Sequence, residues 1–560
     1  MKKIAVRPEA MIAGMVLLVG LAFALFTQHV WEDFWITFRA SKNLATGQGL
    51  VFTPGERLHS FTSPLGVLLP AAFYCLSGNQ SDLFALWLFR VASLAALAAG
   101  LILLFLSLRS LALRSVSCWL TVALIGLDAK IVDFSINGME IGLLIFFLAL
   151  VIHGLLVNGP RQALRLGVGW AGLMWTRPDS CVYIAVLGVG SLLFLTSPAA
   201  GKSPLAWLKT FLRSGLVCTL LYLPWFLWAW SYYGSPVPHT IIAKGVTHPP
   251  INLAPLLTEL LRFPLRILTS TDSSIQFTFL PGYADHGGWS DAYVCLADEL
   301  GVVAALAWLI PVLRPQTRFF SLAYFLGNFF LTDVLSYFPP WYLPAVAVPG
   351  YLTFGLLFDQ TLGLAMKFPQ LGWDCGWFAH LPKILRFSAV GIVAGQLAVT
   401  ICVARQLQVQ QSLIEDGLRR PIGLWLRDHA RTPHDTVMLE PLGYIGYYSG
   451  LKMLDFPGLA SKEMVEVRKR LGPNRENQAY LELRPDWLVL RLWERDSGRY
   501  IDLEGLRKYY EPVAVFDASN KISATHWLPG RPYLLFDQIF LIFHRKPDGP
   551  VKPAASATGE

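Results

Sequence analysis

The sequence contains few charged residues for its length. Asp, Glu, Lys and Arg make up 15% of its 560 residues, whereas 54% are hydrophobic and the mean hydropathy is +0.47. A soluble domain carries about a quarter charged residues, so this chain lacks the polar surface of a water-soluble protein. Apolar runs of about 18 residues or more recur, long enough to cross a hydrocarbon core of about 30 Å. We therefore expect a polytopic α-helical membrane protein.

Concentrated positive charge and paired cysteines are also missing. The net charge of +8 includes no dense Lys/Arg block, which excludes the basic patch of a nucleic-acid-binding protein. The seven cysteines have no metal-ligand spacing, and most lie in apolar runs, as small core residues do. None follows Cys402, so no disulfide is expected within the C-terminal part.

The N-terminus combines basic residues with an apolar run. Lys2, Lys3 and Arg7 precede a hydrophobic segment at about 11–26, as in a signal peptide. No small-residue cleavage site precedes the polar segment at Glu32, and further apolar runs follow. An uncleaved first helix with a cytoplasmic N-terminus is the interpretation that we favour.

The apolar runs predict about eleven transmembrane helices in residues 1–404. With the first helix running outward, the cytoplasmic ends of the helices meet Lys or Arg, as the positive-inside rule requires. The apolar segment 64–76 is too short to span and is expected to be interfacial or re-entrant. A full span there would place Arg109 and Arg114 outside. Two large outer loops follow from this count, at about 30–82 and 232–298.

Residues 405–560 have the pattern of a soluble domain. Short β-type runs, DTVMLE, WLVLRL and YLLFDQIFLIF, alternate with charged helical stretches such as SKEMVEVRKRL. We expect a mixed α/β domain on the extracytoplasmic side. Its last ten residues, VKPAASATGE, predict a disordered tail.

Glu32 and Asp33 follow the first apolar run directly. Their aromatic neighbours Trp31, Phe34 and Trp35 are typical of a membrane interface. Two adjacent carboxylates gain nothing from the bilayer unless they bind cations or transfer protons. Partial desolvation would raise a carboxylate pKa toward the range that suits a general base. We therefore take Asp33 and Glu32 as candidate catalytic residues.

Several basic side chains are predicted to lie on the same outer side as this pair. A lipid phosphate at the interface needs such cations, because Arg binds it in a bidentate manner and Lys acts as a point charge. Any one of them has a structural alternative, such as pairing with Asp179 or Glu140. The candidate set for a donor phosphate or substrate is Arg39, Lys42, Arg57, His59, Arg177, His239 and Lys244.

Five segments resemble a known family. The stretch EDFWITFRASKNLATGQGLVFTPGERLHSFTSPL resembles the first outer loop of bacterial GT-C-fold glycosyltransferases, in particular the terminal arabinofuranosyltransferase-like proteins. The segments NGMEIGLL, WTRPDS, YYGSPVPHTIIAKG and EPLGYIGYYSGLKMLDFPGL are similar to later motifs of that family. The matches spread from residue 32 to residue 459, and thus over most of the chain.

The resemblance implies a reaction. An acceptor hydroxyl on an envelope glycan, lipid or protein attacks a polyprenyl-phosphate-linked sugar with inversion at the outer face of the bacterial plasma membrane. One carboxylate of the pair acts as base, and basic residues hold the phosphate. The chain departs from the pattern at Glu32 (Asp in the family), His239 (Asn) and 60–63 (Gly-Tyr-Thr-Asn). The choice of base therefore stays open, with Asp33 preferred, and so does the sugar.

Two other functions are compatible with parts of the sequence. A transporter or flippase for lipid-linked sugars would place ionisable residues near the bilayer midplane, often in repeated halves, whereas here they lie in loops and no repeat is seen. A non-catalytic scaffold for envelope assembly would leave the carboxylate pair without a role. A divalent cation such as Mg²⁺, Mn²⁺ or Ca²⁺ is left open. Carboxylates that could join the pair in binding it are Asp128, Asp133, Glu140 and Asp179.

Overall fold

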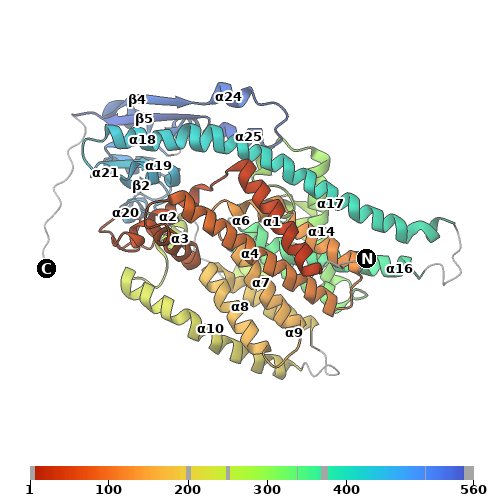
Figure 1. Cartoon of the computed structure of the whole chain (residues 1–560). Coiled ribbons are helices and arrows are strands. Elements are labelled where there is room, and N and C mark those ends of the chain that lie inside the picture. Colours follow the sequence, from red (N-terminus) through yellow and green to blue (C-terminus); the bar gives the residue numbers. More distant parts are fainter. Residues whose placement is uncertain are drawn as a thin grey trace.

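The computed structural model shows a helical N-terminal part that carries a C-terminal domain built on a sheet (Figure 1). The structure describes residues 7–196, 203–247, 253–336, 338–367, 376–498 and 500–547. The tail that was predicted to be disordered lies outside these residues.

The N-terminal part consists of helices that surround one large apolar core. Its first ten helices are α1 (Pro8–Thr27), α2 (Glu32–Ala45), α3 (Pro64–Leu76), α4 (Asp82–Ser110), α5 (Ser115–Gly126), α6 (Ala129–Ile136), α7 (Ile141–Leu156), α8 (Gln162–Thr176), α9 (Cys181–Phe194) and α10 (Pro204–Tyr233). The next seven are α11 (His239–Thr247), α12 (Leu253–Thr269), α13 (Ser274–Thr278), α14 (Asp291–Leu306), α15 (Pro315–Phe329), α16 (Leu343–Ala365) and α17 (Gly376–Gln410).

Five helices in the described residues are long and apolar enough to cross a membrane. They are α1, α4, α10, the segment Asp291–Leu309 and the segment His380–His429, and the bent pair α5 and α6 makes six if it counts as one span. The predicted count of about eleven is higher because it includes apolar helices below the roughly 20 residues of a full span, such as α7, α8 and α9.

The two predicted outer loops are largely helical. The first contains α2 and α3, and α3 has the 13 residues of the short apolar helix expected there. The second contains α11, α12, α13 and the start of α14. Helix α2 forms because Phe34, Trp35 and Phe38 recur at helical spacing and are buried, while its two acidic residues lie at the positive N-terminal end of the helix dipole.

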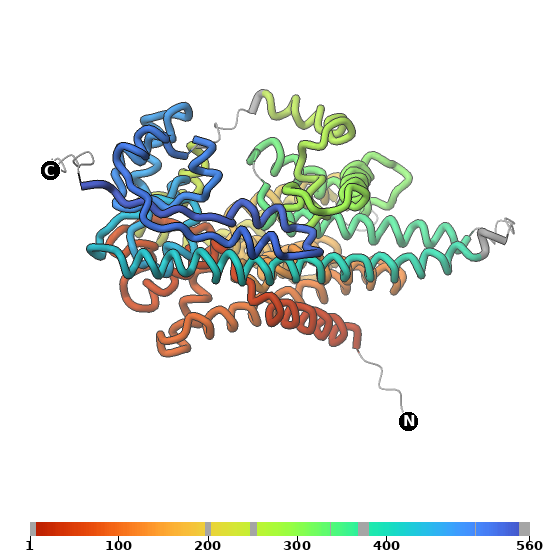
Figure 2. The backbone as a smooth tube through the Cα atoms, turned by 90° about the horizontal axis from the view of Figure 1, so that it is seen from above, coloured from red at the N-terminus to blue at the C-terminus, as the bar shows by residue number. Residues whose placement is uncertain are grey.

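A long helix connects the two parts of the chain. Helix α17 continues through a π-helical segment, Gln411–Arg419, into α18 (Arg420–His429). The expected domain boundary at 404/405 falls within this continuous helix. Figure 2 shows it crossing the whole molecule, with the C-terminal domain around its α18 end. Residues of this helix therefore reach both the apolar bundle and the sheet.

The C-terminal domain has a mixed sheet of five strands in the order β2-β1-β3-β5-β4. The strands β1, β2 and β3 are parallel, whereas β5 runs antiparallel to β3 and β4. The strands are β1 (Thr436–Leu439), β2 (Lys452–Asp455), β3 (Trp487–Arg491), β4 (Tyr510–Asp517) and β5 (Ile539–Arg545). The helices around them are α19 (Leu442–Ser449), α20 (Lys462–Leu471), α21 (Ala479–Leu483), α22 (Leu492–Ser497), α23 (Leu503–Tyr509), α24 (Ser519–Ser523) and α25 (Arg531–Leu534).

The predicted elements of this domain are confirmed with one exception. Strands β1 and β3 and helix α20 coincide with DTVMLE, WLVLRL and SKEMVEVRKRL. In YLLFDQIFLIF only the second half is a strand, and the first half forms helical turns. Pro532 lies in the first turn of α25, where its missing N–H is tolerated, and Asp537 is held by ion pairs to two arginines rather than by a neighbouring strand.

The two parts share apolar cores. Ile36 and Phe52 belong to the cluster that fills one face of the sheet, and Tyr444 of α19 belongs to the cluster around Phe34 and Trp35 of α2. Burial of each such side chain stabilises the contact by about 1.5–3 kcal/mol. The N-terminal end of α2 is therefore enclosed between the helical bundle and the C-terminal domain.

Candidate active site

The backbone at the start of α2 is held from several directions. The amide of Trp31 donates to the carbonyl of Asn137 at 2.8 Å, and the amide of Val30 donates to Gln411 Oε1 at 3.0 Å. Gly138 has a φ of +98°, and a Cβ at that position would lie 2.5 Å from the Phe34 ring. Only glycine fits there without displacing Phe34. The segment NGME, residues 137–140, therefore packs against the first turn of α2 and fixes its position.

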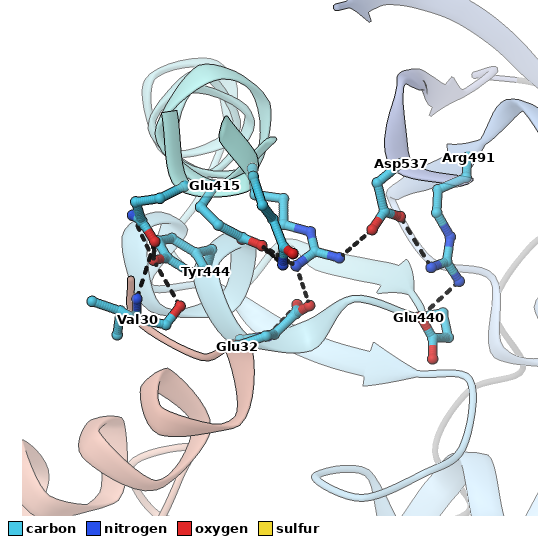
Figure 3. A network of polar contacts seen from close by, with 11 residues as sticks. Val30, Glu32, Glu415, Glu440, Tyr444, Arg491 and Asp537 are labelled. Carbon is cyan, nitrogen blue, oxygen red and sulfur yellow. Dashed lines mark hydrogen bonds and ion pairs between the residues drawn. The ribbon is translucent and has the colours of Figure 1, made fainter. Parts of the chain in front are cut away.

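Glu32 is bound to the C-terminal part of the chain. Its Oε1 accepts a hydrogen bond from the Gly443 amide at 3.0 Å, and its Oε2 lies 2.6 Å from the Arg419 guanidinium (Figure 3). Burial raises the pKa of Glu32, and the Arg419 charge only partly opposes this, because Glu415, Glu440 and Asp537 repel a further negative charge.

Arg419 belongs to a buried network with more carboxylates than arginines. It pairs with Glu415 at 2.9 Å and Asp537 at 2.7 Å, in addition to Glu32. Asp537 also pairs with Arg491 at 3.2 Å, and Arg491 binds Glu440 and Glu494 (Figure 3). Truncation of one partner in such a network leaves an uncompensated buried charge. The network thus ties the start of α2 to the sheet.

Asp33 lies beside Glu32 but in a different environment. Burial raises the pKa of Asp33, while the positive charges of Lys244 and Arg177 oppose the shift. Its side chain is half-buried and lines two neighbouring cavities. A carboxylate with these features has the accessibility and the raised pKa of a general base.

The two cavities meet at Asp33. The larger has a volume of about 360 Å³ and the smaller about 70 Å³. The residues common to both linings are Asp33, Ile36, Lys244, Trp341 and Leu459. Segment 60–63, Glu140 and Arg177 complete the smaller cavity. The C-terminal domain lines the larger cavity through Glu440, Phe456, Arg468, Glu476 and Tyr500, among others.

Two of the predicted basic residues lie at this junction. Lys244 comes from α11 and lines both cavities, and burial lowers its pKa while Asp33 opposes the shift. Arg177 pairs with Asp179 at 3.1 Å and with Glu140 at 3.4 Å. Burial opposes the charge of Arg177, but its acidic neighbours outweigh this and raise its pKa. Arg177 therefore stays cationic beside Asp33.

Arg39, which was predicted as a phosphate or substrate ligand, lies outside the linings of both cavities. Its guanidinium is buried and donates to the carbonyl oxygens of Gly446, Gly450 and Leu451 at 2.7–3.1 Å. It also stacks over the Phe52 ring at 4.3 Å. These carbonyls terminate α19 and lead into β2, so Arg39 joins α2 to the C-terminal domain.

Four further candidates lie outside the linings of both cavities. Arg57 is exposed over the Tyr232 ring at 5.1 Å. His59 is stacked on Tyr233 at 4.4 Å, and burial lowers its pKa to about 4, so it is neutral rather than a phosphate-binding cation. His239 begins α11, its amide donates to the His59 carbonyl at 3.0 Å, and burial lowers the pKa of its ring. Lys42 binds Asp82 and Tyr447 instead.

The carboxylates do not form a metal centre in the described part of the chain. No group of three or more His, Cys, Asp or Glu residues there is arranged to hold a metal ion. Asp128 caps α6 and accepts from Tyr351, while Asp133 pairs with His29. Glu140 and Asp179 are engaged with Arg177. These four carboxylates are thus engaged with other groups in the described part of the chain.

Most of the residues that the C-terminal domain contributes to the site could not be recognised from the sequence. Arg419 and Arg468 stand in ordinary charged stretches without a motif. Glu440 and Leu442 lie in the segment EPLGYIGYYSG, so this motif was the one available signal that the domain reaches the site. Trp341 lies in the aromatic segment YFPPWYLP, which is equally typical of loop packing.

Comparison with known proteins identifies relatives at two levels. Over 243 residues the chain is 27% identical to a terminal β-(1→2)-arabinofuranosyltransferase of Corynebacterium glutamicum. This match covers 39% of the chain and 33% of the relative, so the chain spans about a third of that protein's length. Residues 404–536 match a family model described as a domain of unknown function (DUF8728).

Two solved structures share the arrangement of the chain. The Archaeoglobus fulgidus oligosaccharyltransferase, tethered to an acceptor peptide, matches with a TM-score of 0.54 at 12% identity, over 90% of this chain and 72% of the other. ArnT from Cupriavidus metallidurans bound to undecaprenyl phosphate matches with a TM-score of 0.50 at 12% identity, over 97% and 99% of the two chains. The chain is therefore a multi-pass membrane protein of the GT-C glycosyltransferase fold, with distant homology to terminal β-(1→2)-arabinofuranosyltransferase.

Proposed function

We propose that the protein is an inverting glycosyltransferase that moves a sugar from a polyprenyl-phosphate donor to an acceptor hydroxyl. The observation that carries this proposal is the position of Asp33, which lies where two cavities meet and beside Lys244. In this proposal the site faces the outer side of the bacterial plasma membrane, which agrees with the positive-inside distribution of Lys and Arg in the predicted loops.

Asp33 acts as the base. The acceptor hydroxyl gives its proton to the Asp33 carboxylate, and the oxygen attacks the anomeric carbon from the face opposite the phosphate. The bond between the anomeric carbon and the phosphate oxygen breaks as the new bond forms, so the configuration inverts. Burial raises the pKa of Asp33, which makes the carboxylate a stronger proton acceptor near neutral pH.

Lys244 stabilises the leaving polyprenyl phosphate. It is the basic residue that lines both cavities within the described part of the chain, and its charge lies close enough to Asp33 to shift the pKa of that carboxyl. A cation is most effective where negative charge develops in a site partly shielded from water. Arg177 adds a permanent positive charge, although its own hydrogen bonds go to Asp179 and Glu140.

The two cavities divide between donor and acceptor. Apart from Leu459 the smaller is lined by the helical part, and it contains Arg177, so it suits the phosphate end of a donor that enters from the membrane. The larger combines the aromatic side chains of Trp341, Phe456 and Tyr500 with the carboxylates of Glu440 and Glu476. Aromatic rings and carboxylates are the groups that pack against and hydrogen-bond a sugar, so this side suits an acceptor glycan.

The relatives support this choice of donor class. One structural neighbour is described as bound to undecaprenyl phosphate, another carries an acceptor peptide, and the homologue transfers arabinofuranosyl groups. Such chemistry needs a base and cations, and the smaller cavity offers Asp33 for the first and Lys244 and Arg177 for the second. The identity of the sugar is a matter for experiment, because segment 60–63 and His239 differ from the pattern of the family.

To test the proposal, purified protein is incubated with a panel of undecaprenyl-phosphate sugars and envelope glycan acceptors. Donor consumption and glycosylated acceptor are measured by mass spectrometry. We expect transfer by the wild type and transfer that is slower by about 10²-fold or more in Asp33→Asn. Movement of donors across proteoliposome membranes without any product would instead favour a flippase. Transfer by a folded Asp33→Asn protein at the wild-type rate would contradict the proposal.

A further inference from the structure

We infer that Glu32 is an anchor rather than a second base, and that Arg419 and Gly443 are the positioning residues that hold it. Through this anchor the C-terminal half of the chain sets the direction of Asp33. The inference rests on the proposed function, because it assigns Asp33 the chemical step. It gives a role to part of the domain of unknown function at 404–536.

Both carboxylate oxygens of Glu32 are engaged. Oε1 accepts from the Gly443 amide at 3.0 Å, and Oε2 pairs with Arg419 at 2.6 Å. A base needs a lone pair that is directed at the acceptor hydroxyl, and a carboxylate held at both oxygens is a poor candidate for that step. Glu32 lines the larger cavity, but with both oxygens engaged, whereas Asp33 lines both cavities.

Arg419 cannot move without breaking other contacts. Its guanidinium binds Glu415 at 2.9 and 3.0 Å and Asp537 at 2.7 Å, and Asp537 is fixed in turn by Arg491 (Figure 3). A planar guanidinium that is held on several sides has one available orientation, in contrast to the ammonium group of lysine. Glu32 therefore docks against a preformed partner.

Gly443 brings the backbone of α19 against the first turn of α2. A Cβ at residue 443 would lie 2.1 Å from the Glu32 carbonyl oxygen and 2.5 Å from its Cγ. The first of these atoms belongs to the backbone and cannot rotate away. Gly446, three residues along the same helix, differs in that its Cβ would meet only side chains, at 3.2 Å or more.

The anchor determines where Asp33 points. Successive residues on an α-helix differ in direction by about 100°, because one turn takes about 3.6 residues. With Glu32 bound to α19 and Arg419 in the wall of the larger cavity, the next side chain lies near the charge of Lys244 and lines the smaller cavity as well. The methylene by which Glu exceeds Asp extends the reach of residue 32 toward Arg419.

The first test is a double-mutant cycle with Glu32→Gln and Arg419→Gln, measured with the undecaprenyl-phosphate sugar that the wild type consumes fastest. We expect each single variant to lower kcat by about 10- to 100-fold, with little change in the KM of the donor, because a displaced base slows chemistry more than binding. The double variant should be no slower than the slower single variant. Arg419→Lys should restore part of kcat.

Two outcomes of this cycle would overturn the inference. In the first, the loss of kcat in the double variant equals the product of the losses in the two single variants. In the second, Glu32→Gln loses as much transfer activity as Asp33→Asn. If Asp33→Asn keeps wild-type transfer, the proposed function fails first. If Asp33→Asn is inactive and the cycle is additive, the proposed function stands and the anchor fails.

A second test compares Gly443→Ala with Gly446→Ala and does not alter any charge. We expect Gly443→Ala to fold, to keep its donor KM and to lose about tenfold or more in kcat, whereas Gly446→Ala stays within about twofold of the wild type. Equal activity of the two variants would overturn the inference.

A third test needs no substrate. Full-length protein is treated with a water-soluble carbodiimide and glycine ethyl ester, and modification of Glu32 and Asp33 is quantified by peptide mass spectrometry. We expect Asp33 to be modified and Glu32 to be protected in the wild type, and Glu32 to become reactive in Arg419→Gln. Equal modification of both carboxyls in the wild type would show that Glu32 is not held.

Discussion

Glu32 Oε2 lies 2.6 Å from the guanidinium of Arg419, a residue of the long helix that leads into the C-terminal domain. The contact joins the start of α2 to a network that extends through Asp537 to the sheet. It separates the roles of two adjacent carboxylates, since both oxygens of Glu32 are engaged in the wall of the larger cavity, while Asp33 lines both cavities. The predictions below follow from this separation and from the residues around Asp33.

Replacement of Asp33 by Asn should remove the base. Since general-base catalysis contributes about 10²- to 10⁴-fold, we expect kcat to fall by about that factor with little change in the thermal stability of the protein. The check is single-turnover transfer from the donor identified in the panel. Asp285→Asn is a suitable control because that carboxylate is 50% exposed and lies outside both linings, and its kcat should be unchanged.

The rate of transfer should fall at acidic pH. Only the deprotonated Asp33 accepts a proton, and burial raises its pKa above the usual aspartate value of about 3.9. The value of kcat therefore rises with pH until Asp33 is ionised and then reaches a plateau. In a profile of kcat from about pH 4 to about pH 8, the apparent pKa of the acidic limb should lie above the pKa of a model aspartate. A flat profile across this range would assign proton removal to another group.

Lys244→Gln should weaken the hold on the donor phosphate. A hydrogen bond to a charged group contributes about 1.5–3 kcal/mol, so we expect the Kd for undecaprenyl phosphate to rise by about 10- to 150-fold. Lys244→Arg should keep part of the affinity. Arg57→Gln is the matched control, because Arg57 is exposed over Tyr232 and lies outside both linings. If the two glutamine variants bind equally, Lys244 is not the phosphate ligand.

Tyr500→Ala should impair the acceptor rather than the donor. The ring lines the larger cavity, where it packs edge-on against Phe456 at 4.4 Å. Loss of an aromatic contact of this kind costs about 0.5–1.5 kcal/mol, so the acceptor KM should rise by about two- to tenfold at an unchanged donor KM. Tyr509→Ala, outside the lining, provides the comparison. A rise in the donor KM instead would reverse the assignment of the two cavities.

Gly138→Ala should destabilise the fold. The residue has a φ of +98°, and its added Cβ would meet the Phe34 ring at 2.5 Å. Overpacking of this kind costs about 1–3 kcal/mol, and the left-handed backbone adds strain. The Tm in detergent should therefore fall. Gly215→Ala should leave Tm close to that of the wild type, because no atom lies within 4 Å of its added Cβ.

Much of the architecture could be read from local patterns. The apolar runs predicted helices that the structure contains at α4, α5, α7, α9 and others, and β-type runs predicted β1 and β3. The resemblance to the GT-C fold is confirmed by the comparisons. Of the helices inside the outer loops, α3 was predicted, whereas α2 and α11 were not, because turn residues around them mask the helical spacing of their apolar residues.

By itself the sequence determined the class of the protein and the presence of a carboxylate pair next to basic residues. Hydrophobicity and its period are local properties, and they report burial and helix formation directly. Only the tertiary structure decided which basic residues meet that pair. Arg39 stands six residues from Asp33 and is held by carbonyls of the C-terminal domain, whereas Lys244 is distant in sequence and lines both cavities with it. The meeting of Asp33 and Lys244 depends on packing between segments that are distant in the sequence, and the amino-acid sequence contains no periodic pattern that reports such packing.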